Sequence, residues 1–298
     1  MASGFHYGGQ AVIEGVMMRG QRSMVTVVRR PKGDLVANTQ SLATIYTSWL
    51  RKTPLVRGII VLIEAMVLGM KTLLYSANVS LEEEEEEISG WLAWVLVVLS
   101  LVLAIGLFFI APLFLTGFVD PYIESSLLFH LVEGFVRLVI FIVYLRLMML
   151  VPDIKRVFSY HGAEHKTVNA YEAGVPLEVE AVREYSTAHV RCGTSFLFTV
   201  MVIAILVFAI IGQQSVWLMV LWRVALIPVI AALSYEVTYF GANHSKNVLV
   251  RAILAPGLWL QALTTREPDD SQLEVAISAL KRVIEIDQPE GEAVQEPS

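Results

Sequence analysis

Residues 91–115, WLAWVLVVLSLVLAIGLFFIAPLFL, decide the fold, because they form a run of 25 residues without a charged side chain. A helix needs about 20 mostly apolar residues to cross the hydrocarbon core of a bilayer. The run therefore predicts a membrane-spanning helix. The whole chain agrees with this prediction, since hydrophobic residues make up 55%, charged residues only 17%, and the mean hydropathy is +0.61. An ordinary soluble domain carries about 25% charged residues.

Three further segments are long and apolar enough to span a membrane, at 127–151, 195–212 and 216–235. Two weaker apolar runs, 58–75 and 248–263, are interrupted by charged residues, and the second also by a Pro-Gly pair. We therefore expect a mainly α, polytopic membrane protein with about four spans. The two weaker runs are expected to form interfacial or re-entrant helices.

The distribution of basic residues predicts the orientation. Residues 1–57 hold eight Lys and Arg against two acids, which places the N-terminus in the cytoplasm. If 58–75 does not cross, the loops 116–126 and 213–215, which lack Lys and Arg, lie outside, and the basic loop 152–194 lies inside. If 58–75 does cross, that basic loop faces outside. We favour the first topology, a multi-pass protein of the inner (plasma) membrane with both termini cytoplasmic.

The chain outside the spans is expected to form small peripheral elements. Two β-prone runs flank the turn sequence Pro31-Lys32-Gly33-Asp34 and predict a hairpin within 22–42. Ser271 to Glu274 fits a helix capping box. The expected order along the chain is a cytoplasmic β-element at 1–57, an interfacial or re-entrant helix at 58–77, an acidic loop with the first two spans at 78–151, a cytoplasmic loop at 152–194, the third and fourth spans at 195–235, a cytoplasmic interfacial segment with an amphipathic helix at 236–286, and a disordered tail at 287–298.

Charge and cysteine content exclude several classes of protein. The net charge is −6, but six acids lie in the single run Glu82 to Glu87, and the remainder is near neutral. This balance argues against a nucleic-acid partner. The acidic run is read as a solvated loop, with an acidic partner site as the alternative. The single cysteine, Cys192, excludes an intrachain disulfide. The polar, glycine-rich start shows no signal peptide.

The segment 160–166, YHGAEHK, carries the main chemical signal. On a helix, His161 and His165 lie one turn apart on the same face, with Cβ atoms about 6 Å apart. Two imidazoles placed in this way can share one divalent ion. With Glu164 the pattern is H-x-x-E-H, the inverted zinc-protease motif, in which a carboxylate acts as general base for a metal-bound water. The segment therefore predicts a Zn²⁺ site with Glu164 as the catalytic base. The alternative is a surface His/Glu cluster without a metal.

Further candidate ligands lie outside this motif. His189 and Cys192 have the spacing i,i+3 and directly precede the third span. Glu172 lies on the same helical stripe, seven residues after His165, and Glu236 lies at the end of the fourth span. We include all four as candidate metal ligands. Cys192 is alternatively a small buried residue next to a helix cap, and Glu236 is alternatively an interfacial carboxylate paired with Arg223, Lys246 or Arg251.

The second span contains an unusual pair of charges. Glu133 and Arg137 have the favourable i,i+4 order on a helix. Charges at membrane depth are costly and face the protein interior. We expect the two side chains to neutralise each other; a polar route for a headgroup or proton is the alternative.

Four motifs make the sequence recognisable: GGQAVIEGVMMRG (8–20), YHGAEHKTVNAYE (160–172), HVRCGTSF (189–196) and PGLWLQALTT (256–265). Together they resemble the YqhQ-like family of bacterial multi-spanning membrane proteins, from about Gly8 to about Leu280. The family is a domain of unknown function, described generically as predicted metal-dependent enzymes. The resemblance thus implies a metal-linked role for the H-x-x-E-H segment and for the segment with His189 and Cys192.

These observations favour a membrane-embedded, metal-dependent hydrolase with its site at the cytoplasmic face. A divalent metal, Zn²⁺ by preference, is the expected cofactor, and the substrate is expected to be a membrane-associated peptide or a lipid-linked molecule. The alternative is a non-enzymatic membrane scaffold or assembly factor that binds a protein partner. A transporter and a Cys192 nucleophile with His189 as base are weaker hypotheses. The lipid bilayer is the expected partner, and a homo-oligomer remains open.

Overall fold

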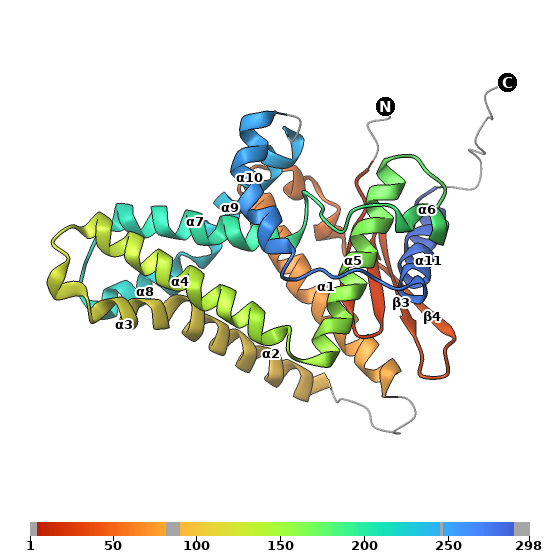
Figure 1. Ribbon diagram of the computed structural model, residues 1–298, viewed down its shortest axis with the longest axis horizontal. Coiled ribbons are helices and arrows are strands. Elements are labelled where there is room, and N and C mark those ends of the chain that lie inside the picture. Colours follow the sequence, from red (N-terminus) through yellow and green to blue (C-terminus); the bar gives the residue numbers. More distant parts are fainter. Residues whose placement is uncertain (1–4, 82–89, 245–246, 289–298) are drawn as a thin grey trace.

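The computed structural model of the chain describes residues 5–81, 90–244 and 247–288. Its two parts are seen in Figure 1: a group of helices (α2, α3, α4, α7 and α8) projects to one side, and a small sheet flanked by helices forms the other. The long helices are α1 (Val56–Ser80), α2 (Gly90–Ile105), α4 (Ser126–Met148), α5 (Pro152–Glu172), α7 (Gly193–Ile211), α9 (Ile227–Asn243), α10 (Val248–Gln261) and α11 (Asp270–Asp287). The short ones are α3 (Ala111–Gly117), α6 (Val179–Arg183), α8 (Val216–Ala225), a π-helical segment (Gly106–Ile110) and the 3₁₀ turns Thr44–Tyr46, Trp49–Lys52 and Asp120–Tyr122.

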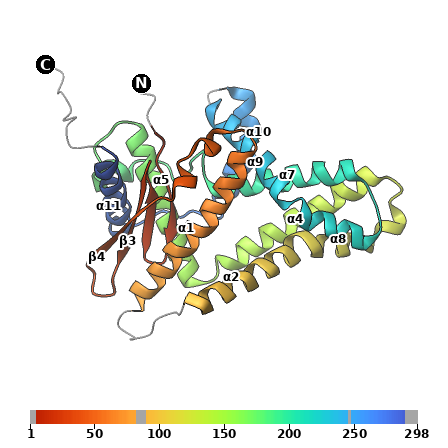
Figure 2. The ribbon, with the colours of Figure 1, turned by 180° about the vertical axis from the view of Figure 1, so that it is seen from behind.

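The N-terminal residues form the expected small β-element. It is an antiparallel sheet with the strand order β1-β2-β3-β4, and it includes the predicted hairpin as β3 and β4. The strands run over Gly8–Val12, Gly15–Arg19, Ser23–Arg29 and Leu35–Ser41. Because neighbouring side chains in a strand point to opposite faces, Met18 packs toward α5 and α11 whereas Met17 packs toward α1. Figures 1 and 2 show these helices on the two faces of the sheet.

The turn between β1 and β2 fixes the sheet on α5. Glu14 occupies this turn with φ of 51°, a left-handed conformation that is uncommon outside glycine. Its carboxylate accepts two hydrogen bonds of 2.5 Å from Arg156 and a third of 3.2 Å from the Tyr160 hydroxyl. Both donors lie on α5, so the turn and the helix hold a fixed mutual position.

The weaker apolar run 58–75 forms most of α1. Its acidic residue, Glu64, faces the sheet rather than lipid, because it is buried in ion pairs with Arg19 and Arg51. The opposite side of the helix exposes apolar side chains such as Ile63 and Met66. The run was expected to form an interfacial or re-entrant helix, whereas by length and apolarity α1 is itself a candidate span, although it also lies against the sheet.

Four helices of the described residues are long and apolar enough to cross a membrane, or five if a bent pair is counted. A mainly α membrane fold with four candidate spans and a small N-terminal sheet is thereby confirmed. Three of the expected spans lie in Gly90–Gly117, Ser126–Met148 and Gly193–Ile211. The fourth expected span, 216–235, is not one straight helix, because α8 and α9 meet at 51°. Pro228, at the start of α9, has no N–H to continue the preceding helix.

The charges inside the bundle gather around one carboxylate. Glu133 accepts a hydrogen bond of 2.6 Å from Arg137, as expected, and it also pairs with Arg223 of α8 and with His130 at 3.3 Å. All four side chains are at most 2% exposed. The two guanidinium groups also lie near the ring of Phe208, which adds cation–π attraction. The cluster thus ties α4 to α8 inside an apolar bundle.

The π-helical segment contributes to this cluster. In a regular helix the carbonyl of Phe108 would accept a hydrogen bond from residue 112, but Pro112 has no N–H. Arg137 donates from Nε to this carbonyl at 2.9 Å. The proline therefore leaves a backbone acceptor at membrane depth that the buried arginine satisfies.

Two predictions at the ends of helices need comment. The amphipathic C-terminal helix exists as α11, but the predicted capping box was placed two residues too late. Asp269 is the N-cap, and it exchanges hydrogen bonds with Gln272, because the chain turns into the helix before Ser271. The acidic run Glu82 to Glu87 and residues 289–298 of the tail lie outside the described residues.

Candidate metal centre

Two of the predicted ligands lie on α5 and a third lies at the start of α7. The rings of His161 and His165 have centroids 4.4 Å apart, as expected for one face of a helix. Cys192 is the N-cap residue of α7, and its Sγ lies 3.3 Å from Nε2 of His161. One ligand atom from each of the three residues lies within 4.8 Å of the others. The structure therefore brings these three predicted ligands together.

The hydrogen bonds of the two Nδ1 atoms indicate which nitrogens of His161 and His165 are free to bind a metal. Nδ1 of His161 lies 2.9 Å from the carbonyl oxygen of Thr264, and Nδ1 of His165 lies 2.5 Å from that of Thr187. A carbonyl oxygen only accepts hydrogen bonds, so both Nδ1 atoms must carry the proton. In the neutral rings each Nε2 then has a free lone pair. Backbone carbonyls orient metal-binding histidines in the same way.

One distance between ligand atoms is close to that around a tetrahedral ion. Zn–N bonds of about 2.05 Å and Zn–S bonds of about 2.3 Å separate a nitrogen and a sulfur ligand by about 3.55 Å. Cys192 Sγ and His161 Nε2 lie 3.3 Å apart, slightly closer than this, and the ligand atoms of all three residues lie within 4.8 Å of one another. Three N and S ligands with a fourth position left open are typical of catalytic zinc sites.

Glu164 lies beside this group, on the same turn of α5. It is 5% exposed, its Oε1 accepts a 2.8 Å hydrogen bond from the Gly9 N–H, and its Oε2 lies 3.5 Å from Nε2 of His165. A side chain at position 9 would collide with the Met17 carbonyl and would press on Glu164. Glycine is therefore needed for strand β1 to pass close enough to hold the predicted base.

His189 lies next to the group but faces another partner. Its ring centroid is 5.6 Å from that of His165, whereas its Nε2 lies 3.7 Å from the Glu172 carboxylate. Burial lowers the pKa of His189, although the Glu164 carboxylate opposes this shift. The side chain is 7% exposed, so a neutral ring is favoured here. A fourth ligand at this position would require the ring to turn.

The other two predicted ligands are engaged elsewhere. Glu172 is paired with Arg191 and lies 3.5 Å from His6, at the edge of the centre. Glu236 on α9 is held by Arg57 and by the Leu55 N–H. Neither belongs to the three-residue group. Glu236 is thus paired with an arginine, but the partner is Arg57 and not Arg223, Lys246 or Arg251, which the sequence offered as alternatives.

Several positioning residues escaped the sequence analysis. Gln261 on α10 accepts from the His189 N–H at 2.9 Å and donates to the His189 carbonyl at 2.7 Å. Gly162 lies so close to the Arg266 carbonyl that any side chain there would collide with it. The motif 256–265 contains Gln261 and Thr264, but nothing local in it indicates contact with α5. The contacts of Gln261 with His189 and of Thr264 with His161 form only because the folded chain brings the end of α10 beside these two histidines.

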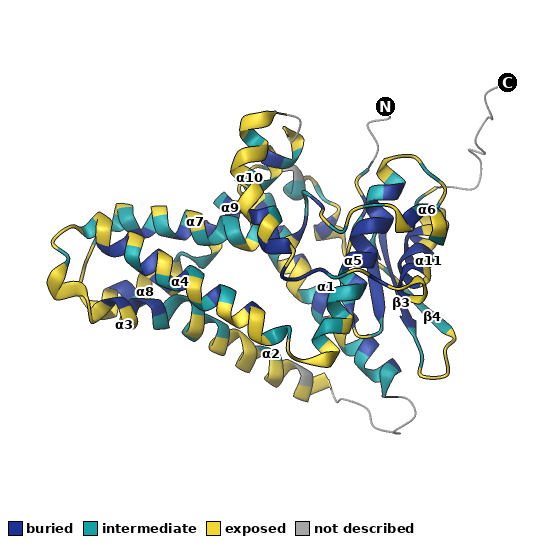
Figure 3. Ribbon diagram, viewed as in Figure 1, coloured by how far each residue is buried: buried dark blue, intermediate teal, exposed yellow. Residues whose placement is uncertain are grey.

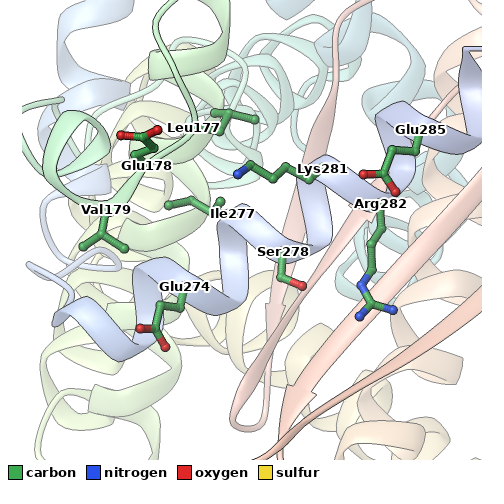
Figure 4. A pocket seen from close by; sticks show the side chains of 9 residues that line it. All are labelled: Leu177, Glu178, Val179, Glu274, Ile277, Ser278, Lys281, Arg282 and Glu285. Carbon is green, nitrogen blue, oxygen red and sulfur yellow. The ribbon is translucent and has the colours of Figure 1, made fainter.

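A surface pocket of about 650 Å³ lies apart from this centre, over α11 and the segment before α6. Figure 4 shows the side chains that line it. Its lining carries both signs of charge, as in Glu178, Glu274 and Lys281. None of its lining residues is a predicted ligand or the predicted base, so the pocket does not add to the site.

Comparison with known proteins places the chain in a family. Residues 53–286 match the family described as "Protein of unknown function (DUF1385)". The chain belongs to this family. A similar protein is "Uncharacterized protein YqhQ" of Bacillus subtilis (strain 168), which is 36% identical over 296 residues, 94% of this chain and 93% of the relative. No solved structure matches the chain significantly. These names establish the family and assign no reaction, so the function is argued from the geometry.

Proposed function

We propose that this chain is a membrane-embedded metal-dependent hydrolase whose centre is His161, His165 and Cys192, with Glu164 as the base. The observation that carries the proposal is the approach of His161 Nε2 to Cys192 Sγ while both α5 histidines have Nδ1 occupied by carbonyls. Two imidazoles and a thiol are a preferred ligand set for Zn²⁺. His189 is kept as a candidate fourth ligand.

The residues around the centre suit hydrolysis. A bound Zn²⁺ supplies Lewis-acid chemistry at neutral pH. The Gly9 N–H holds one oxygen of Glu164, and the other oxygen is directed to the Nε2 side of His165. Glu164 is thus placed to take a proton from a water that attacks a carbonyl carbon, and to return it to the leaving group.

The position of the centre supports a membrane-associated substrate. Cys192 caps α7, which is one of the candidate spans, so the ligand atoms lie at the level where a span begins. The basic residues of 152–194 favour the cytoplasmic face of the inner membrane. A peptide bond close to a span or an ester of a lipid-linked molecule would reach this depth.

The test is metal analysis of the purified chain. We expect about one equivalent of Zn²⁺ in the wild type and none in the His161→Ala/His165→Ala variant. His244→Ala is the matched control, since His244 is exposed and lies outside the group. Glu164→Gln should keep the metal and fail to complement a deletion strain. A wild type that binds no metal ends the proposal, and full complementation by Glu164→Gln favours the scaffold alternative.

One observation favours a second function, a cysteine nucleophile. The base beside the Cys192 thiol is His161, whereas the sequence suggested His189. Thr264 orients the His161 ring, and the Thr194 N–H points to Sγ at 3.4 Å. If Cys192 is the nucleophile, Cys192→Ser abolishes activity without changing the metal content. If it is a ligand, the same change lowers metal affinity.

A further inference from the structure

Helix α10 has two faces with opposite surroundings. Val248, Leu249, Ile253 and Trp259 are 61–77% exposed and lie along one side at helical spacing. Figure 3 shows this helix mostly in the colour of exposed residues. The other side is buried at Gly257, Leu260 and Gln261. Such an apolar outer stripe is unfavourable in water.

The inner face of α10 holds the candidate centre. Gly257 lies against Ser195 of α7, where an added Cβ would come within 3.3 Å of the serine Cβ. Gln261 binds both backbone groups of His189. Just beyond the helix, the Thr264 carbonyl accepts from His161, and its hydroxyl contacts that of Thr194 at 2.9 Å. Any displacement of α10 therefore moves Gln261, the partner of His189, and Thr264, the partner of His161.

The surroundings of α10 indicate what covers its outer face. It follows α9, the second half of the bent pair of apolar helices, and packs on the start of the span α7. Tryptophan and tyrosine are enriched at membrane surfaces. Trp259 on α10 and Tyr239 on α9 are both exposed, and the Arg57 guanidinium lies 3.8 Å from the centre of the Tyr239 ring. A stripe continuous with a membrane bundle and edged by such residues is typical of an interfacial helix.

We infer that the outer face of α10 binds the lipid surface, and that this contact keeps the candidate centre assembled. The inference rests on the proposed function for the identity of the centre, but its own test does not use metal or activity. Lipid is the occupant, and α10 transmits its presence to Gln261 and Thr264. The centre is then complete only in a bilayer, where a membrane-held substrate is also present.

The contact is tested by quenching of tryptophan fluorescence. The full chain is placed in nanodiscs with phospholipids brominated near the headgroup end of the acyl chain. The difference between wild type and Trp259→Phe isolates the signal of Trp259, and we expect bromine to quench it by more than half. An unquenched Trp259 overturns the inference. If the discs then hold two contacting copies of the chain, a second copy covers the stripe.

The coupling is tested by the reactivity of Cys192, the single cysteine, which is 5% exposed. In metal-free nanodiscs, Leu249→Ser/Ile253→Ser should speed maleimide labelling of Cys192 about tenfold, because local opening becomes easier. The matched control is Leu206→Ser/Ile210→Ser, which changes the same residue types at the same spacing near the distal end of α7. Equal labelling rates in wild type and both variants overturn the coupling.

The two experiments separate this inference from the proposed function. Absence of Zn²⁺ in the wild type removes the metal hydrolase but leaves the quenching and labelling results valid. Conversely, a wild type that binds Zn²⁺ without lipid quenching of Trp259 keeps the hydrolase and removes the lipid contact.

Discussion

The candidate metal centre and the charged centre of the bundle contain similar residues but differ in how their lone pairs are used. In the bundle, the Glu133 carboxylate is shared by Arg137, Arg223 and His130. At the candidate metal centre, carbonyl oxygens hold the Nδ1 atoms of His161 and His165, so Nε2 stays available. The first arrangement neutralises charge, whereas the second presents ligands.

This difference shows that burial of His and Glu alone does not indicate a functional site. Nε2 of His130 lacks a hydrogen-bond partner, yet it joins no metal-sized group among the described residues. What distinguishes the α5 histidines is the convergence of a third donor, Cys192, from another part of the chain. The following predictions test this contrast, from the largest effect to the smallest.

Removing the bundle carboxylate should have the largest effect on folding. Glu133→Gln leaves two buried guanidinium groups without a counter-charge, and we expect a loss of about 3–5 kcal/mol in stability. Thermal unfolding in nanodiscs measures it. Glu172→Gln is the control, because that partly exposed ion pair contributes about 1 kcal/mol or less. Wild-type stability of Glu133→Gln would mean that the cluster is not structural.

Removing one ligand should affect the metal and not the fold. His161→Ala is expected to weaken Zn²⁺ binding by more than about 100-fold, since even outer-shell partners contribute 10–100-fold. Competition with a chromogenic chelator measures this affinity. The apparent melting temperature of the metal-free variant should stay close to that of the metal-free wild type. Unchanged affinity would exclude His161 as a ligand.

Crowding α5 should disturb the centre through its support. In Gly162→Ala the new methyl group collides with the Arg266 carbonyl, and we expect about 1–3 kcal/mol of destabilisation with weaker metal binding. Gly193→Ala is the control, because a Cβ there meets no atom within 4 Å. Chemical denaturation of both variants provides the comparison, and equal stabilities would contradict the close approach of α5 to residue 266.

Acidification should weaken the fold near His189. Because burial lowers the pKa of His189, the unfolded chain binds this proton more readily than the folded chain. Stability is complete above the ordinary pKa of about 6.5 and falls as the pH drops from there toward the folded pKa, by at most about 1.4 kcal/mol per pH unit. His189→Gln should show a flatter pH profile in unfolding experiments between pH 7.5 and 5. An identical slope would place the titration in another group.

Local patterns were sufficient to place His161 and His165 on one face of a helix, although helix α5 itself was not predicted within the expected loop 152–194. The i,i+4 spacing of His161 and His165 fixes their geometry on any helix, and Cys192 is marked by the polar segment before an apolar run. The spans at 91–115, 127–151 and 195–212 could likewise be predicted from the sequence, because the length of an apolar run is sufficient to indicate a membrane span.

What remained hidden depends on contacts between distant residues. Glu236 pairs with Arg57, 179 residues earlier, and no local signal distinguishes this pair from a metal ligand. The acidic Glu64 made its run look unsuited to cross a membrane, yet Glu64 is paired with arginines from the N-terminal part of the chain.

The dispersed origin of the candidate centre has a consequence for biosynthesis. Its parts come from the Gly9 amide, the α5 histidines, Cys192 and the Thr264 carbonyl. A nascent chain still attached to the ribosome before residue 264 emerges lacks the group that orients His161. The candidate centre therefore assembles only after synthesis has passed residue 264, and a shorter nascent chain lacks it.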